Sequence, residues 1–311
     1  MQDKSLVTII CLCYNQEKYV VESLLSAVNQ DYPFIELIIV DDFSTDNSKE
    51  TIQNWLVDYP EIQFIANETN LGSTKSFNKA LKLAKGDYII DLACDDILLP
   101  NCVSLQLKAF QQNRFKNLGI VYGNAELINE KGNFYFYYFP ADASKKTIEK
   151  RQIGDIYLSV ISGGNSICSV SSMVKKTVFD DLKGYDEDLA YEDLDLWIRA
   201  SRKYDFDYID EILIKKRIST TSFGTHFHLK NDSRSKKINY STYLIIQKAI
   251  HLNRSKIEHK AILKRMHFEM ILAYKTANYN LLFKYILLEI KQRFRIIKKG
   301  FSESVSYALH F

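Results

Sequence analysis

The sequence predicts an α/β protein, with a doubly wound, mixed sheet flanked by helices and a helical region at its C-terminal end. Short apolar runs alternate with amphipathic stretches over the first 125 residues, which is typical of βαβ units. From about residue 226 the pattern is almost wholly helical, and no proline follows Pro140. The 311 residues are 46% hydrophobic and 25% charged, a composition that excludes disordered and collagen-like chains.

The elements of the first half follow from periodicity. Apolar runs of five to seven residues predict the strands, and apolar positions three or four apart predict the helices between them. Cap-type residues Ser44, Asp46 and Asn47 should open the second helix, and Pro100 suits the first turn of the fourth. The predicted strands are 7–13, 36–40, 62–66, 87–93 and 119–124, and the predicted helices are 20–28, 47–56, 74–85 and 100–113.

The pattern changes after residue 125. An aromatic strand or hairpin is predicted at 134–139, a polar loop at 142–151, a short helix at 153–161, a strand at 167–174 and a helix at 194–202. We therefore expect one domain over 1–225, made of two halves (about 1–125 and about 126–225), and a basic helical region over 226–311.

Charge is distributed unevenly along the chain. Residues 1–225 contain 24 Lys and Arg against 33 Asp and Glu, whereas residues 226–311 contain 17 against 5. In the stretch 280–299, six apolar residues share one helical face and the cations Lys284, Lys291, Arg295 and Lys298 share another. This helix either packs on its own domain or lies on an anionic membrane, and the excess of cations favours the membrane. Nucleic acid is disfavoured because the body is acidic and carries no recognised binding motif. The apolar residues are Phe283, Ile286, Leu287, Ile290, Phe294 and Ile297.

Targeting and cysteine patterns suggest the compartment. The apolar run 6–13 is too short for a signal segment with its cleavage site, and no run of 18 uncharged apolar residues occurs. The five Cys include no C-x-x-C, so neither a disulfide framework nor a zinc module is indicated. We expect a cytoplasmic protein, peripheral on the inner face of the cell membrane.

Polar residues follow three of the predicted strands. Tyr14-Asn15-Gln16 follows the first, Asp41-Asp42 the second and Asp95-Asp96 the fourth. Ligands of open α/β sheets bind at this edge, and two acidic pairs there repel unless a cation and hydrogen-bond donors lie between them. Each pair alone could be a helix cap, and Glu192-Asp193 could be a dipole-favoured first turn. No dinucleotide-binding glycine motif and no P-loop is present.

Five blocks in order resemble the family-2 inverting glycosyltransferases with a GT-A fold. The blocks are VTIICLCYNQEKYVVESLLSAVNQ, ELIIVDDFSTDNS, NLGSTKSFNKAL, GDYIIDLACDDILLP and GYDEDLAYEDLDLWIRA, and the resemblance covers about residues 6–222. It implies transfer of a sugar from a nucleotide diphosphate sugar, with UDP as the expected nucleotide, to a glycan or lipid-linked acceptor. It also implies that the half 1–125 binds the nucleotide sugar and that the half 126–225 binds the acceptor.

The resemblance also implies roles for particular residues. The nucleotide would bind at Cys13, Tyr14, Asn15, one carboxylate of the Asp41-Asp42 pair, Lys75 and Asp95. Asp96, with Asp95, would hold Mg2+ or Mn2+, which neutralises the leaving diphosphate. Asp193 would be the general base, supported by Glu192, because in-line inversion needs one carboxylate on the acceptor's side. Acceptor or donor-sugar contacts are expected at Gly163, Gly164, Asn165 and Trp197, and at the aromatic run 134–139.

The chain also departs from the family pattern. Ala93 replaces the first acid of the common D-S-D-D, Phe77 stands where Arg is frequent, and Ser219 stands where a His often follows the last strand. These departures keep open a second function, a weak or inactive nucleotide-sugar-binding scaffold. A sugar-1-phosphate nucleotidyltransferase is disfavoured, because 11–19 contains none of the glycines of its N-terminal loop.

Overall fold

The structure is a computed structural model that describes residues 4–112, 114–163, 167–219 and 223–308. By its internal contacts the chain divides into two compact units. The first unit contains 1–156, 165–188 and 203–219, and the second contains 157–164, 189–202 and 220–311. Two segments from the predicted acceptor half thus belong to the unit of the C-terminal helices. A domain boundary at residue 225 stays a prediction.

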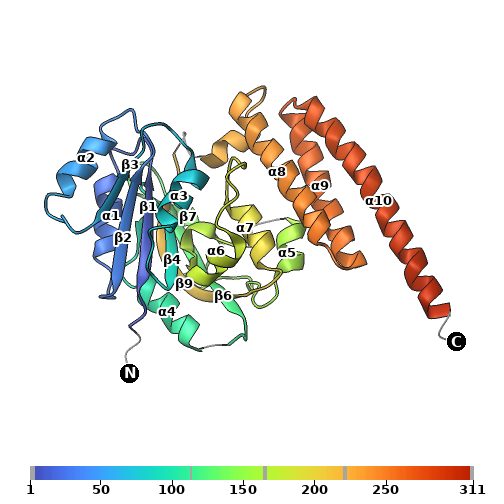
Figure 1. Ribbon diagram of the computed structural model, residues 1–311, viewed down its shortest axis with the longest axis horizontal. Coiled ribbons are helices and arrows are strands. Elements are labelled where there is room, and N and C mark those ends of the chain that lie inside the picture. The colour runs from blue at the N-terminus through green and yellow to red at the C-terminus, as the bar shows by residue number, and fades with distance from the viewer. Residues whose placement is uncertain (1–3, 113, 164–166, 220–222, 309–311) are drawn as a thin grey trace. The chain divides into compact units, whose positions relative to one another are not determined.

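The first unit is built on a mixed sheet of nine strands (Figure 1). The strand order is β3-β2-β1-β4-β8-β6-β9-β5, and β7 pairs with β6 outside this path. β1 pairs in parallel with β2 and β4, whereas β8 pairs antiparallel with both β4 and β6. The strands are β1 (Val7–Cys13), β2 (Ile35–Asp41), β3 (Gln63–Ala66), β4 (Tyr88–Ala93), β5 (Ile97–Leu98), β6 (Leu118–Ile128), β7 (Phe134–Tyr137), β8 (Met173–Lys175) and β9 (Asp205–Arg217).

Helices of the first unit cover the sheet. Six of the seven β1 residues are buried although successive side chains point to opposite faces, so both faces of this strand are covered. α1 and α3 contact β1 and β2, and α4 contacts β6 and β9. The helices are α1 (Val20–Val28), α2 (Ser48–Trp55), α3 (Ser73–Leu81), α4 (Cys102–Gln112) and α6 (Lys176–Leu182).

The predicted elements of the nucleotide half are confirmed within a few residues, and the largest differences lie after residue 150. The predicted strand 167–174 is wrong in its first part: Ser169–Ser171 form a 3₁₀ helix, where the Ser171 hydroxyl bonds the Cys168 and Gly123 carbonyls. The predicted helix 153–161 begins only at Tyr157, because Gly154 exchanges two backbone hydrogen bonds with Phe206 of β9. Strand β5 and helix α6 were not predicted, and no range was predicted for β9.

The second unit is helical. It contains α5 (Tyr157–Ser162), α7 (Asp193–Ala200), a 3₁₀ helix (Phe223–His228), α8 (Ser233–Leu252), α9 (Lys256–Lys275) and α10 (Tyr279–Ala308). α9 contacts α5, α8 and α10, and α7 contacts α5 and α8. Local sequence explains two helix starts: the Asp232 carboxylate accepts from Ser235 N, and Ser255 with Glu258 forms a capping box.

α10 packs on α9 with a different face from its apolar stripe. Leu281, Tyr285 and Gln292 are buried, whereas the six apolar residues predicted to share a face are 41–62% exposed. The interpretation that this stripe packs on the protein itself is therefore wrong in the structure. No helix in the described part of the chain combines the length and apolarity that a membrane crossing requires.

Candidate active site

A pocket of about 490 Å³ opens beyond the ends of β2 and β3. Asp41, the last residue of β2, lies in its wall together with the ring of Phe43 and the amine-bearing Lys49 of α2. The rest of the lining is Ser44, Ala66, Asn67 and Glu68. The lining therefore includes carboxylate, amide, amine and aromatic groups, which suits a small ligand with both a ring and polar edges.

Asp41 presents an unsatisfied acceptor in this pocket wall. Its side chain is fully buried, and Oδ2 accepts a hydrogen bond from Ser44 N at 3.1 Å. Oδ1 is buried and has no hydrogen-bond partner among the described residues. A buried carboxylate oxygen without a donor is costly, so a ligand N–H at this position would gain more than it would at the surface.

Asp42, in contrast, is engaged by the protein itself. Oδ1 accepts from Asn67 Nδ2 at 2.9 Å, from Ser76 Oγ at 2.8 Å and from Leu71 N at 2.9 Å. Oδ2 accepts from the backbone N–H of Gly72 at 2.8 Å. Gly72 precedes α3 with φ +86°, a backbone conformation that favours glycine. The two adjacent aspartates thus differ: Asp42 binds the segment that leads into α3, whereas one oxygen of Asp41 has no donor among the described residues.

The loop after β1 is tied to the loop after β2. Asn15, with φ +57°, donates its N–H to Ser44 Oγ at 3.0 Å and accepts from Thr45 N at 2.8 Å. Tyr14 is 46% exposed, so its ring is available at this edge. The Cys13 side chain instead is buried, and a hydrogen bond with the Cys94 thiol together with burial strongly raises its pKa. A contribution of Cys13 to ligand binding would come from its backbone.

Two features of this edge were not singled out from the sequence. Phe43 follows the acidic pair with φ +64°, a strained conformation for a bulky residue, and its ring is half exposed in the pocket lining. Lys49 is the cation that lines the pocket, whereas the predicted Lys75 is exposed on α3. Lys49 is the second residue of α2, and only the fold shows that it lies beside the pocket.

The Asp95-Asp96 pair forms a tight turn directly after β4. Asp96 is buried, and its Oδ1 accepts from Arg217 N at 2.8 Å. Burial, followed by the neighbouring Asp95 carboxylate, raises the pKa of Asp96 to about 8, and burial also raises the pKa of Asp95. The positive charges of Lys216 and Arg217 oppose both pKa shifts. The turn holds two carboxylates where their negative charge is costly.

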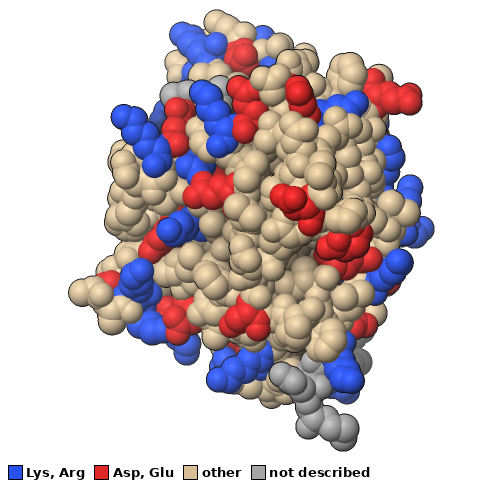
Figure 2. Space-filling view, turned by 90° about the vertical axis from the view of Figure 1, so that its left-hand side faces the viewer, with Lys and Arg blue, Asp and Glu red and all other residues tan. Residues whose placement is uncertain are grey.

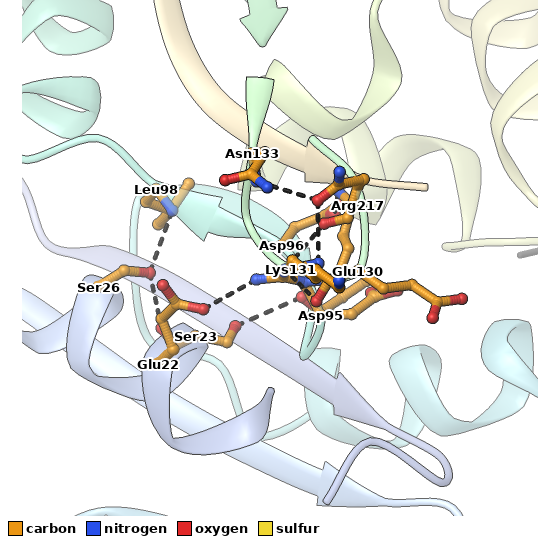
Figure 3. A network of polar contacts seen from close by, with 12 residues as sticks. Glu22, Ser23, Ser26, Asp95, Asp96, Leu98, Glu130, Lys131, Asn133 and Arg217 are labelled. Atoms are coloured by element: carbon orange, nitrogen blue, oxygen red, sulfur yellow. Dashed lines mark hydrogen bonds and ion pairs between the residues drawn. The ribbon is translucent and has the colours of Figure 1, made fainter. Parts of the chain in front are cut away.

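Arg217, the last residue of β9, connects this turn to two other segments (Figure 3). Its Nε donates to the Asp95 carbonyl at 3.0 Å, and its Nη2 lies 2.8 Å from Glu22 Oε2 of α1. Nη1 donates to the carbonyls of Asn129 and Glu130 in the β6–β7 turn, at 3.2 and 3.3 Å. A buried guanidinium with this many partners fixes the acidic turn against neighbouring backbone.

The donor chemistry of Asp95 and Asp96 fits a divalent cation. Carboxylate oxygens are the ligands that Mg2+ and Mn2+ prefer, and a cation would relieve the electrostatic cost that raises the pKa of both groups. In the described part of the chain, no group of three or more His, Cys, Asp or Glu is placed to hold a metal. Further ligands would have to come from bound substrate and water.

The second unit carries the predicted base. Asp193 is the first residue of α7, partly buried, and its Oδ1 accepts from Leu194 N at 2.6 Å. Glu192 precedes it at the cap position. Trp197 is buried in this unit, and Gly163, with φ +90°, lies close to the Arg265 side chain. Gly164 and Asn165 lie outside the described residues.

The surface charge of the first unit is mixed on the side seen in Figure 2. There acidic and basic side chains are interspersed around a central area of uncharged residues. Because neither sign of charge dominates on this side, it does not present the positive electrostatic potential that would attract a polyanion.

Comparison with known protein families finds matches to glycosyltransferases. The family model described as Glycosyl transferase family 2 matches residues 8–175. The chain is 36% identical over 222 residues to an uncharacterized glycosyltransferase, MJ1057, of Methanocaldococcus jannaschii, covering 70% of this chain and 72% of that protein. It spans 30–59% of the length of five other relatives.

Two solved structures share the fold. Staphylococcus aureus TarS, residues 1–349 in complex with UDP-GlcNAc, has a TM-score of 0.63 at 18% identity, over 86% of this chain and 75% of TarS. The mannosyltransferase PcManGT of Pyrobaculum calidifontis, in complex with GDP-Man and Mn2+, has a TM-score of 0.59 at 14% identity, over 98% and 81%. The predicted GT-A fold, a mixed sheet flanked by helices with C-terminal helices, is confirmed.

Substitution of Asp42 should cost more stability than substitution of Asp41. Asp42→Ala leaves the buried amide of Asn67 and hydroxyl of Ser76 without their acceptor, so we expect a loss of about 2–4 kcal/mol in the free energy of unfolding. Asp41→Asn keeps an acceptor for Ser44 N and should cost about 1 kcal/mol or less. Urea unfolding of both variants measures the difference, and equal losses would contradict it.

Proposed function

The chain belongs to glycosyl transferase family 2, and we propose that it transfers a sugar from a UDP-sugar to a hydroxyl of a glycan or lipid-linked acceptor, with inversion. The observation that carries the donor half of this proposal is the buried, unpartnered Oδ1 of Asp41 in a pocket at the ends of β2 and β3. Nucleotide sugars are the donors bound by both TarS and PcManGT.

We assign the binding of the nucleobase and of the ribose to residues of the first unit. Uracil presents one ring N–H between two carbonyls, so a single carboxylate oxygen such as Asp41 Oδ1 can accept from it. The exposed ring of Tyr14 and the ring of Phe43 offer flat surfaces for the base, and Lys49 is the cation that lines the pocket. Lys75 stays the cation proposed for a phosphate. Asn15 and the Cys13 backbone complete the base side, and Asp95 lies near the ribose.

The diphosphate is assigned to the acidic turn. Asp96, with Asp95, would hold Mg2+ or Mn2+, which when bound stabilises the charge of the departing diphosphate. PcManGT was solved with Mn2+ on a similar fold. The chain's own contribution is to fix the carboxylates before substrate arrives, and Arg217 does so through Asp96 Oδ1 and the Asp95 carbonyl.

We assign to Asp193 the role of accepting the proton of the acceptor hydroxyl. Inversion in one displacement requires a carboxylate that accepts the acceptor hydroxyl's proton while the oxygen attacks the anomeric carbon. The Leu194 N–H on Oδ1 orients the Asp193 carboxylate, and Oδ2 is the oxygen proposed to take the proton. Glu192 supports it. The acceptor is proposed to lie near Gly163, Gly164 and Asn165, whereas the burial of Trp197 favours a structural role for its ring.

A weak or inactive nucleotide-sugar-binding scaffold is the alternative. Ala93 and Ser219 favour it, because each replaces a polar group frequent in the family. It predicts donor binding without turnover.

The acceptor's location is proposed to be an anionic membrane surface. The exposed stripe of α10 offers six large apolar side chains, and Lys284, Lys291 and Arg295 lie beside it at helical spacing. Such a helix can bury the stripe at the boundary of headgroups and acyl chains while its cations bind lipid phosphates. A lipid-linked acceptor and a peripheral location at the inner face of the membrane are consistent with this arrangement.

Donor binding should depend on metal and on Asp96. We expect one nucleotide class in a panel of UDP-, GDP-, dTDP- and CMP-sugars to stabilise the wild type by about 2.7 kcal/mol at 100 times its Kd. Removal of Mn2+ with EDTA, or Asp96→Ala, should abolish the gain, whereas the exposed Asp58→Ala should keep it. Thermal unfolding measures all four, and absence of any stabilisation would contradict the donor site.

Turnover should depend on Asp193. Asp193→Asn keeps the size and an acceptor for Leu194 N but cannot take a proton, so release of UDP should fall at least 100-fold while donor-induced stabilisation is retained. An enzyme-coupled assay for UDP measures turnover. An Asn variant with wild-type turnover would remove Asp193 as the base, and a wild type that binds donor without turning it over would favour the scaffold.

Membrane binding should require both charge and the apolar stripe. Full-length protein should sediment with vesicles containing anionic lipid, less so as salt rises, and Ile290→Asp with Phe294→Asp should weaken binding more than tenfold. Val57→Asp, at a more exposed apolar residue of the first unit, is the matched control. Equal binding to neutral vesicles, or unchanged binding by the double variant, would refute this surface.

A further inference from the structure

The segment 190–195 carries the proposed base and enters α7; we refer to it as the base segment. Its apolar neighbours Leu196 and Ile198 are buried and hold α7 in the second unit. Apolar packing tolerates small rotations and shifts, whereas hydrogen bonds and ion pairs have directional geometry. The polar contacts of the base segment are therefore the ones that define where the Asp193 carboxylate stands.

The N-terminal side of the base segment is bound to α8 by two hydrogen bonds. Ala190 N donates to Ser241 Oγ at 2.8 Å, and the hydroxyls of Tyr191 and Thr242 lie 2.8 Å apart. Tyr191, Ser241 and Thr242 are all buried, so water does not compete for these bonds. Burial also raises the pKa of Tyr191, which keeps its hydroxyl protonated at neutral pH.

The C-terminal side is bound to the same helix by an ion pair. The Asp195 side chain is 1% exposed, and its Oδ1 lies 2.7 Å from Lys248 Nζ of α8. Its Oδ2 lies 2.6 Å from Arg199 Nε, one turn along α7. Removal of the Lys248 amine would leave the Asp195 carboxylate paired with Arg199. The main effect would therefore be a shift in the position of the base segment, and not the cost of an unpaired buried charge.

We propose that Ser241, Thr242 and Lys248 of α8 are positioning residues for the general base, an inference that rests on the proposed function. They bind the chain on both sides of Glu192 and Asp193. The matched family region ends at residue 175, so α8 lies outside it. The C-terminal helical region thereby contributes to the chemical step as well as to the membrane surface.

The separate effects on kcat and KM distinguish a misplaced Asp193 carboxylate from a general loss of protein stability. The double variant Thr242→Val, Lys248→Met should lower kcat for the nucleotide sugar that stabilises the protein most by tenfold to 100-fold, since a misplacement of about 1 Å is enough for such a loss. The KM for that donor should stay within twofold, because the donor is assigned to residues of the first unit. Thr242→Ser with Lys248→Arg, which keeps the hydroxyl and the charge, should restore kcat to within threefold of the wild type.

A matched control lies in the same unit. Glu289→Gln removes the negative charge that pairs with His267 of α9 and with Arg293 of α10. Neither pair involves the base segment, so kcat should be unchanged. If the double variant is unfolded at the assay temperature, the single variants Tyr191→Phe and Ser241→Ala carry the same comparison.

The outcomes distinguish this inference from the function on which it rests. A double variant with wild-type kcat, beside an inactive Asp193→Asn, would overturn the positioning role alone. So would a fall of kcat that the Ser and Arg replacements do not restore, or an equal fall in the Glu289→Gln control. Full turnover by Asp193→Asn would instead overturn the assignment of the base.

Discussion

Burial of acidic groups at the carboxyl ends of β2 and β4 is the constraint on which the first unit depends. Asp41, Asp42 and Asp96 are all buried there, and each needs donors to offset the loss of water. The chain supplies backbone N–H groups from Ser44, Leu71, Gly72 and Arg217. The bonds to Asp42 fix the loop after β2 to the segment before α3, and the bond to Asp96 fixes the turn after β4 to the end of β9. Oδ1 of Asp41, a residue that lines the pocket, is buried without a donor among the described residues.

Arg217 extends this arrangement across the sheet. Its guanidinium is almost fully buried, yet its ion-pair partner Glu22 is largely exposed, so the attraction between the two is weak compensation for desolvation. The three carbonyls of Asp95, Asn129 and Glu130, with the ring of Tyr19 at 4.3 Å, supply the rest. An arginine serves here where lysine would not, because its planar fork reaches partners in several directions at once. The acidic turn is consequently rigid before any cation or diphosphate is bound, which lowers the ordering cost of binding.

The sequence predicted the fold of the nucleotide half well because hydrophobic period and strand-end chemistry are local signals. It placed Asp41, Asp42, Asp95 and Asp96 at one sheet edge without distinguishing Asp41 from Asp42. Which of these two binds Gly72 and which has an oxygen without a donor depends on residues 25 to 34 positions away. Arg217 and Lys49 escaped notice because a lone cation has no local pattern. The strand predicted over 167–174 was partly wrong because serine hydroxyls at Ser171 and Ser172 bond nearby carbonyls and convert the extended run into a 3₁₀ turn. The six apolar residues of α10 were predicted correctly as one face, but only the structure shows that the opposite face packs on α9.

The distribution of roles between the two units has a physical rationale. A donor site gains from preorganised dipoles, which the strand ends provide, whereas an acceptor has to arrive at a surface and present one hydroxyl to one carboxylate. α8 carries the contacts that hold the base segment, α9 packs on α8, and α10 packs on α9 with its apolar stripe exposed. These three helices form one continuous stack, so the proposed membrane surface and the proposed positioning helix belong to the same unit. Under the proposed function, a departure such as Ser219 in the first unit would bear on donor affinity, whereas substitutions along α8 would bear on proton transfer.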